Sequence, residues 1–261
     1  MRYEAATDIG GVQGEFLTTH WTLVEGIQAK NTQQRALIDL LIRRYWKPVY
    51  CYLRQKGYSN EQAKDLTQGF FQEVVLGREL ILRADPSKGR FRSFLLHALK
   101  YYALNERAKE TAQMRAPKNG LTSLDSIDPQ DIPESVLSRG PEASYDYAWV
   151  SALLDEVLAA VEASCRENGL DIHWELFNAR LVQPILTGQV PPPLQEIGEA
   201  WGVDDPSRAS NMIIAAKRRF RETLRRCVRR TVADEGLTEG ELEEIVKFLP
   251  ESAQDYLACR E

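Results

Sequence analysis

Apolar residues in this 261-residue chain recur at intervals of three and four, and no stretch alternates apolar with polar residues over the length of a strand. Because an α-helix repeats every 3.6 residues and a strand every two, such spacing places side chains on one face of a helix. The clearest run consists of Ala36, Leu37, Leu40, Leu41, Tyr45 and Val49. We therefore predict an all-α fold.

Local signals set the ends of the helices in the first block, 30–112. Gly57 closes the first long helix, and Ser59 with Gln62 has the spacing of a capping box, in which each side chain accepts a hydrogen bond from the other residue's backbone. A proline and a glycine within 84–89 predict a loop there. The helices on either side of this loop are expected to bury Ala63, Leu66, Phe70 and Val74, and Phe94, Leu95, Ala98, Leu99, Tyr102 and Ala103.

Composition changes between the first block and a second block, 148–232. Residues 116–144 are rich in Pro, Gly, Ser and Asp and hold few large apolar side chains. Such a segment cannot bury enough surface to offset the backbone entropy that is lost when it becomes ordered. We expect 113–147 to be a flexible linker between two helical domains, with an N-terminal segment, 1–29, before them and an acidic helical tail, 233–261, after them.

The second block contains the pattern of a helix-turn-helix. A short helix is predicted from 194 to 203, and Gly202 ends it. Its inward-facing residues are expected to be Leu194, Ile197, Ala200 and Trp201. Asp205 then provides the N-cap, and Pro206 the first position, of a second and longer helix. A short helix, a glycine turn and a second helix with a basic face are typical of DNA-binding proteins.

The longer helix has two chemically different faces. One face is apolar and consists of Ala209, Ile213, Ala216, Phe220, Leu224 and Cys227. The opposite face carries Arg208, Asn211, Ala215, Arg218 and Glu222. Asparagine can form two hydrogen bonds with adenine, and arginine can do so with guanine, so this face suits the major groove. The expected duplex-contacting residues are Ser207, Arg208, Ser210, Asn211, Arg218 and Arg219.

Charge is distributed unevenly, although the net charge of the whole chain is −5. Residues 204–230 hold nine basic and three acidic side chains, whereas residues 231–261 hold nine acidic and two basic ones. Attraction to phosphate acts over a Debye length of about 8 Å at physiological salt, so an acidic protein can bind DNA through a basic patch. The alternative is that the basic helix pairs with the tail inside the fold. We expect the tail to form a helix near 239–249 and to fold back over the basic helix.

The sequence lacks the residues that several classes of function require. No apolar run approaches the roughly 18 residues of a membrane span, and 1–14 shows no secretory signal, so we expect no membrane as a partner. The four cysteines form no CxxC pair and the three histidines lie far apart, which predicts no metal site and a cytoplasmic location. No cluster of Asp, Glu and His suits catalysis. We therefore expect no enzyme, no catalytic residue and no cofactor, and a nuclease is the least favoured alternative.

Basic and aromatic residues are interleaved in the first block. They run from Lys88 to Leu96 and continue from Lys100 to Arg107. Cations can hold the phosphates of a single DNA strand while aromatic rings stack on its exposed bases. This segment therefore suits DNA whose strands have been separated. The alternative for its tyrosines is packing in the core, which we expect for Tyr102 and leave open for Tyr101.

These segments resemble those of bacterial RNA polymerase sigma factors of the extracytoplasmic-function (ECF) type, within the sigma-70 family. A subgroup of that family opens with Phe-x-Thr-Thr-His-Trp, which here spans Phe16 to Trp21. Residues 65–71 are similar to the polymerase-clamp-binding helix, 91–107 to the helix that opens the minus-ten element, and 194–225 to the helix-turn-helix that reads the minus-thirty-five element. The resemblance implies that the first block is sigma region 2 and the second is sigma region 4.

The resemblance also implies partners and site residues. The partners are core RNA polymerase, promoter DNA and an anti-sigma factor or another regulator, a role that the C-terminal tail could take instead. Polymerase binding is implied for Asp65, Gln68 and Phe71. Minus-ten DNA binding is implied for Arg90, Arg92, Lys100, Tyr101, Asn105, Arg107 and Lys109. Two departures are Gly69, where the family usually has Glu, and Tyr101, where many members have Asn.

The main alternative is a DNA-binding regulator that borrows this architecture without engaging polymerase. In that case Asp65 and Gln68 form an ordinary solvated helix face, and the helix-turn-helix acts alone. Complex formation with core polymerase distinguishes the two hypotheses.

Overall fold

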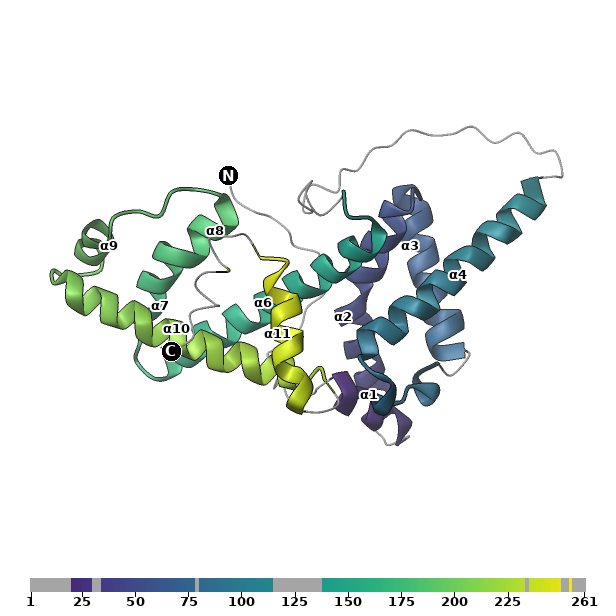
Figure 1. Cartoon of the computed structure of the whole chain (residues 1–261), viewed down its shortest axis with the longest axis horizontal. Helices are drawn as coiled ribbons and strands as arrows, with labels where there is room; N and C mark the ends of the chain where they lie inside the picture. Colours follow the sequence, from purple (N-terminus) through teal and green to yellow (C-terminus); the bar gives the residue numbers. More distant parts are fainter. Residues whose placement is uncertain are drawn as a thin grey trace.

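Figure 1 shows the computed structural model of the chain, which describes residues 20–29, 34–77, 80–114, 138–232, 235–249 and 254. Every regular element within these ranges is a helix, and none is a strand. The all-α prediction is therefore confirmed for the described residues. Most of the predicted N-terminal segment lies outside them, apart from a helix that begins at His20.

The first half of the chain forms a helical bundle. Its elements are α1 (His20–Gln28), α2 (Gln34–Gln55), α3 (Asn60–Gly69), η1 (Phe70–Gly77), η2 (Leu80–Arg83), η3 (Pro86–Lys88) and α4 (Phe91–Met114). Here η1 is a π-helix that continues α3, and η2 and η3 are 3₁₀ turns. Gln28 ties α1 to these turns, since its Nε2 donates to the carbonyls of Ile81 and Ala84 at 2.9 and 3.0 Å.

The turn signals lie where the spacing predicts them. Ser59 caps α3: its Oγ accepts a hydrogen bond from the N–H of Gln62 at 3.3 Å, and Gln62 Oε1 accepts one from the N–H of Ser59 at 3.0 Å. Gly57 after α2 and Gly89 before α4 adopt φ angles of 94° and 117°, which strongly favour glycine. Helix α4 continues to Met114, past the predicted end of the first block at 112.

The second half of the chain is another group of helices. Its elements are α6 (Pro141–Glu167), α7 (Asp171–Phe177), η4 (Asn178–Val182), α8 (Gln183–Thr187), α9 (Leu194–Ala200), α10 (Pro206–Arg229), η5 (Glu235–Leu237) and α11 (Thr238–Val246). Helix α11 confirms the predicted tail helix. The predicted linker is shorter than expected because 141–147 belongs to α6, which starts at a proline, a residue suited to the first helical position. Residues 115–137 of the linker lie outside the described residues.

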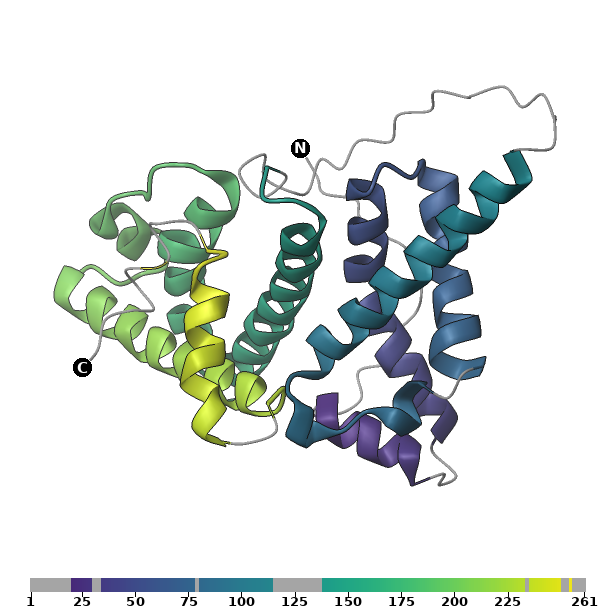
Figure 2. The same ribbon diagram turned by 45° about the vertical axis from the view of Figure 1, so that its right-hand side comes forward.

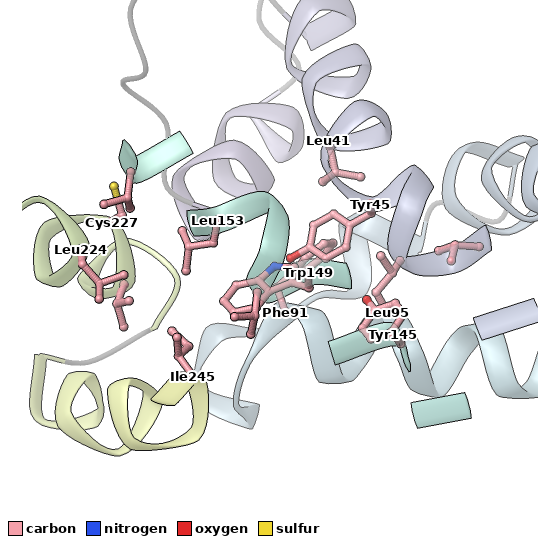
Figure 3. Packing of buried hydrophobic residues seen from close by; sticks show 14 of the residues in the cluster. Leu41, Tyr45, Phe91, Leu95, Tyr145, Trp149, Leu153, Leu224, Cys227 and Ile245 are labelled. Carbon is pink, nitrogen blue, oxygen red and sulfur yellow. The ribbon is translucent and has the colours of Figure 1, made fainter. Parts of the chain in front are cut away.

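The two halves share one buried cluster. Helix α6 packs along α2, and in Figure 2 it stands between the two groups of helices. An ion pair between Arg44 of α2 and Glu156 of α6 also joins the halves. Buried side chains from both sides meet here, among them Leu41, Tyr45, Phe91, Leu95, Tyr145, Trp149 and Leu153 (Figure 3). This arrangement differs from the expectation of two modules held together only by a linker.

Gly69 ends α3 in close contact with a side chain of α4. A Cβ atom at this position would lie 2.4 Å from Oη and 3.6 Å from Cζ of Tyr102. Tyr102 is buried, as expected, and its ring centroid lies 5.6 Å from that of Phe70, so the densely packed surroundings restrict its movement. Glycine therefore permits this close approach at the position where the resembled family usually has Glu.

We expect Gly69→Ala to lower the free energy of unfolding by about 1–3 kcal/mol, the usual cost of overpacking a buried contact. In a Tyr102→Phe background the clashing oxygen is gone, and the higher helix propensity of alanine should make the same substitution neutral or stabilising. Urea unfolding of the four proteins, followed by circular dichroism, measures this coupling. Equal losses in both backgrounds would contradict the contact.

Candidate nucleic-acid interface

The helix-turn-helix depends on a close approach between α9 and the start of α10. Helix α9 ends in a turn in which Gly202 adopts a φ of 71°. The N–H of Val203 donates to the carbonyl of Gly198 at 2.8 Å and closes this turn. A Cβ atom on Gly198 would lie 2.5 Å from the carbonyl oxygen of Val203 and 3.7 Å from Cβ of Ala209. Glycine at 198 therefore lets the turn fold back and brings α9 against α10.

Helix α10 begins at the predicted residue and buries the predicted face. Asp205 Oδ1 accepts a hydrogen bond from the N–H of Ser207 at 2.9 Å, and Pro206 occupies the first helical position. The apolar face consists of buried Ala209, Ile213, Ala216, Leu224 and Cys227, with Phe220 half-buried. The two-faced character of this helix is therefore confirmed.

Two residues of the helix predicted over 194–203 differ from their predicted inward orientation. Ile197 is buried, but Ala200 and Trp201 are exposed, Trp201 to 45%. The reason is that α9 packs against α10 through Gly198. This residue follows Ile197 in the chain and does not belong to the predicted apolar stripe. The backbone of Trp201 has also left helical angles, so the helical repeat no longer places its side chain.

The face of α10 opposite the core is exposed and carries groups that can read bases. Ser207, Arg208, Asn211 and Arg218 are all exposed. Arg218 Nε donates to Oε1 of Glu222 at 3.1 Å. Because an exposed ion pair of this kind contributes little stability, Arg218 can exchange it for a contact with DNA at small cost.

Two of the predicted duplex-contacting residues lie partly beneath this face. Ser210 and Arg219 are half-buried, and Arg219 Nη1 donates to Oγ of Ser164 on α6 at 3.3 Å. In this arrangement Arg219 holds α10 to α6. Ile214, which the sequence pattern did not single out, is instead 58% exposed. The sequence could have pointed to Ile214, because it is an apolar residue that lies outside the buried stripe of the helix. Such a side chain can make an apolar contact with the methyl group of thymine.

The outer side of α4 carries exposed aromatic and amide groups. Tyr101 is 61% exposed, and Leu104 and Asn105 are also exposed. His97 packs edge-on against Tyr101, with 5.1 Å between the ring centroids. The two neighbouring tyrosines therefore differ, since Tyr101 faces solvent while Tyr102 packs in the core. An exposed ring of this kind can serve as a platform for an unstacked base.

Cations further along α4 lie close to carboxylates. Lys100 Nζ lies 2.9 Å from Oε1 of Glu142 on α6, and Lys109 Nζ lies 2.5 Å from Oε1 of Glu106. The hydrogen bond from Lys100 lowers the pKa of the Glu142 carboxyl. Lys100, Glu142 and the exposed Arg107 border a hollow of about 380 Å³. These ion pairs are partly exposed, so salt and DNA phosphate can compete with them.

Arg90 and Arg92, at the start of α4, pair with a buried carboxylate. Arg90 Nε lies 2.6 Å from Oε2 of Glu241 on α11, and Arg92 Nη2 lies 3.2 Å from Oε1 of the same carboxylate. Arg92 is 7% exposed, and its guanidinium lies 4.5 Å from the centroid of the Trp149 ring. In this structure Arg92 is therefore buried, and its predicted minus-ten contact, which needs an accessible side chain, stays a prediction. The physical reason is that α6 and α11 supply the ring and the carboxylate that cover it.

The residues with a predicted role in polymerase binding divide between surface and core. Asp65 and Gln68 are exposed on α3. Phe71 is 3% exposed and stacks on Trp46, with 6.0 Å between ring centroids and 13° between ring planes. In this structure Phe71 therefore supports the face from within, because a large aromatic ring gains more from packing than from exposure.

No protein-family model, curated protein or solved structure matches this chain. Among the described residues, no group of three or more His, Cys, Asp or Glu side chains could hold a metal ion. No helix in the described ranges combines the length and the apolar character that a membrane span needs. Cys51, Cys165 and Cys227 are buried free thiols. The candidate interface therefore rests on its own geometry, namely the exposed faces of α10, α4 and α3.

Burial raises the pKa of the Glu241 carboxyl above its ordinary value of 4.5, even though Arg90 and Arg92 lower it. Asp146 and Glu244 act in the same direction as burial. A folded state that holds this proton more tightly than the unfolded state loses stability as the pH rises through the raised pKa. We therefore expect the unfolding free energy of the wild type to fall, relative to that of Glu241→Gln, from pH 4.5 toward neutrality.

Urea unfolding of both proteins at a series of pH values measures this difference, in which the contributions of the other carboxyls largely cancel. The opposite trend would mean that the two guanidiniums outweigh burial.

Proposed function

We propose that this chain is a sigma factor of the ECF type, which directs core RNA polymerase to promoters and helps to open the DNA. The observation that carries the proposal is the exposed face of α10, where Arg208, Asn211 and Arg218 stand opposite a packed apolar face. A capped helix that follows a glycine turn and presents an amide and two guanidiniums has the chemistry to read base edges in a major groove. The sequence resemblance extends this reading from DNA to polymerase.

Each half of the chain has a separate task in this proposal. Region 4, 148–232, holds the upstream duplex through α10. Region 2, 30–112, docks the exposed Asp65 and Gln68 on the polymerase clamp and places α4 against the minus-ten element. In the cytoplasm the two regions then contact separate promoter elements, region 4 through α10 and region 2 through α4.

Strand opening requires binding energy and no covalent chemistry from this chain. Unstacking a base costs roughly a few kcal/mol, and stacking it on an aromatic side chain returns about 1–3 kcal/mol. Tyr101 offers such a ring on the outer side of α4, and the ring of His97 supports it. Lys100 and Arg107 can hold the phosphates of the same strand. The polymerase then performs the synthesis.

A regulator that binds DNA without polymerase is the second candidate, since the α10 face would serve it equally well. Mixing the purified chain with core polymerase distinguishes the two. A sigma factor co-elutes with the polymerase and gives promoter-dependent transcripts, whereas a regulator binds duplex DNA alone. Duplex binding without a polymerase complex would show that the sigma factor proposal is wrong.

We expect Asp65→Asn combined with Gln68→Ala to weaken binding to core polymerase by about tenfold or more, because a hydrogen bond to a charged group contributes about 1.5–3 kcal/mol. Asp39→Asn is the matched control, since it removes an exposed carboxylate from α2. It should leave the affinity unchanged. Anisotropy of the labelled chain, titrated with core polymerase, measures both proteins. If the double variant bound polymerase with wild-type affinity, the exposed face of α3 would not be part of the polymerase interface.

We expect Arg208→Ala and Asn211→Ala each to weaken sequence-specific duplex binding by about 1–3 kcal/mol, the cost of losing one bidentate base contact. Polymerase association should stay unchanged. Arg166→Ala is the control, because it removes an exposed arginine from α6. The measurement uses polymerase loaded with each variant and a promoter selected from random-sequence duplex DNA. Loss of polymerase association in Asn211→Ala would contradict the division of tasks.

A further inference from the structure

Glu241 on α11 is a buried carboxylate held between two arginines. Its side chain is 1% exposed, whereas Glu239 and Glu243 on the same helix are exposed. Its Oε2 lies 2.6 Å from Nε of Arg90, and its Oε1 lies 3.2 Å from Nη2 of Arg92. Two guanidiniums from the start of α4 therefore converge on one anionic group.

The site that receives this anion is built by α4 and α6. The Trp149 ring packs on the Arg92 guanidinium, and Tyr145 Oη donates to the backbone carbonyl of Arg92 at 3.2 Å, so Arg92 is fixed from two sides. Nη1 of Arg92 is buried without a hydrogen bond, and Oδ1 of Asp146 lies 3.6 Å from it. The carboxylates therefore satisfy the site incompletely. A phosphate group offers more acceptor oxygens in the geometry that guanidinium prefers.

The contact between Glu241 and this site is costly to maintain. Burial outweighs the nearby arginines and raises the pKa of Glu241, and burial likewise raises the pKa of Asp146. Buried ion pairs often add little net stability, because the loss of hydration offsets their attraction. An external anion can therefore replace Glu241 without a large loss of free energy.

We propose that Arg90 and Arg92 form a phosphate-binding site for promoter DNA, which Glu241 occupies in the closed arrangement of this structure. Helix α11 must then leave before a separated strand can bind at the start of α4. This inference rests on the proposed function and adds its regulation, since DNA competes with the tail of the chain itself.

Helix α11 is suited to this role because it contacts both halves of the chain. Ile245 belongs to the shared buried cluster, and in Figure 3 its side chain extends from α11 into that cluster. Glu239 Oε1 lies 2.7 Å from Nη2 of Arg225 on α10, and both of these side chains are exposed. Release of α11 therefore uncovers the start of α4 and one end of α10 together.

Glu241→Gln tests the competition in the full-length chain. The probe is a fluorescein-labelled single-stranded DNA of mixed sequence, and anisotropy gives its affinity at several salt concentrations. Opening two arginines to phosphate adds two contacts that release counterions, so the slope of log K against log salt should become more negative by about 1.4. At low salt we expect affinity on the order of tenfold higher than that of the wild type.

Glu243→Gln is the matched control, because it makes the same charge change at an exposed position of the same helix. Its affinity and salt slope should equal those of the wild type. Adding Arg90→Gln to Glu241→Gln should reverse about half of the change in slope, since one phosphate contact is then lost. Wild-type affinity and slope in Glu241→Gln, or an equal gain in Glu243→Gln, would overturn the proposal.

Hydrogen exchange on the wild-type protein is a second measurement, which decides the matter even if Glu241→Gln does not fold. Loss of amide protection over 238–246 at saturating single-stranded DNA supports displacement of α11, and unchanged protection overturns it. Binding of the wild type to core polymerase is measured separately. If the wild type binds polymerase but Glu241→Gln does not change DNA affinity or salt slope, only the proposed role of the tail is wrong. If Glu241→Gln changes them but no polymerase complex forms, only the sigma factor assignment is wrong.

Discussion

A guanidinium that is buried away from water needs carboxylates around it. The burial of Arg92 therefore requires α6 and α11 to pack against the start of α4. Asp146 and Trp149 of α6 and Glu241 of α11 surround its head at the start of α4. Removing one partner of a buried ion pair costs about 3–5 kcal/mol, so neither α6 nor α11 can move away without a replacement for its charge. The contacts among these three helices, together with the packing of α6 along α2, therefore hold the two halves of the chain together.

Local features can be predicted from the sequence, because their determinants lie close together in the chain. Ser59 and Gln62 satisfy each other across one helical turn, and Asp205 caps α10 two residues away. The apolar stripe of α10 follows from the helical repeat alone. The same repeat places Arg208 and Asn211 on the exposed face, so the face that we propose to read duplex DNA can be predicted before any tertiary contact is known.

Contacts between distant segments could not be predicted, because no local pattern separates a cation that faces solvent from one that pairs inside. Arg92 and Tyr101 lie in the same basic and aromatic stretch, yet one is buried and the other exposed. The group that decides this is a carboxylate 149 positions away in the chain. Phe71 likewise finds Trp46 from another helix, and a Pro- and Gly-rich composition hides the start of α6 at Pro141.

Helix α11 covers cations of α4 and leaves exposed the face of α10 that we propose to read DNA. In the proposed function this asymmetry orders the events of promoter binding. Helix α11 pairs with Arg225 toward the end of α10, whereas Arg208 and Asn211 at its start face solvent. The excess of basic over acidic side chains across 204–230, nine against three, attracts duplex DNA while Glu241 still occupies the α4 site. If that site binds phosphate, duplex recognition precedes strand capture. The upstream contact then raises the effective concentration of phosphate near α4, which is what displaces the tail.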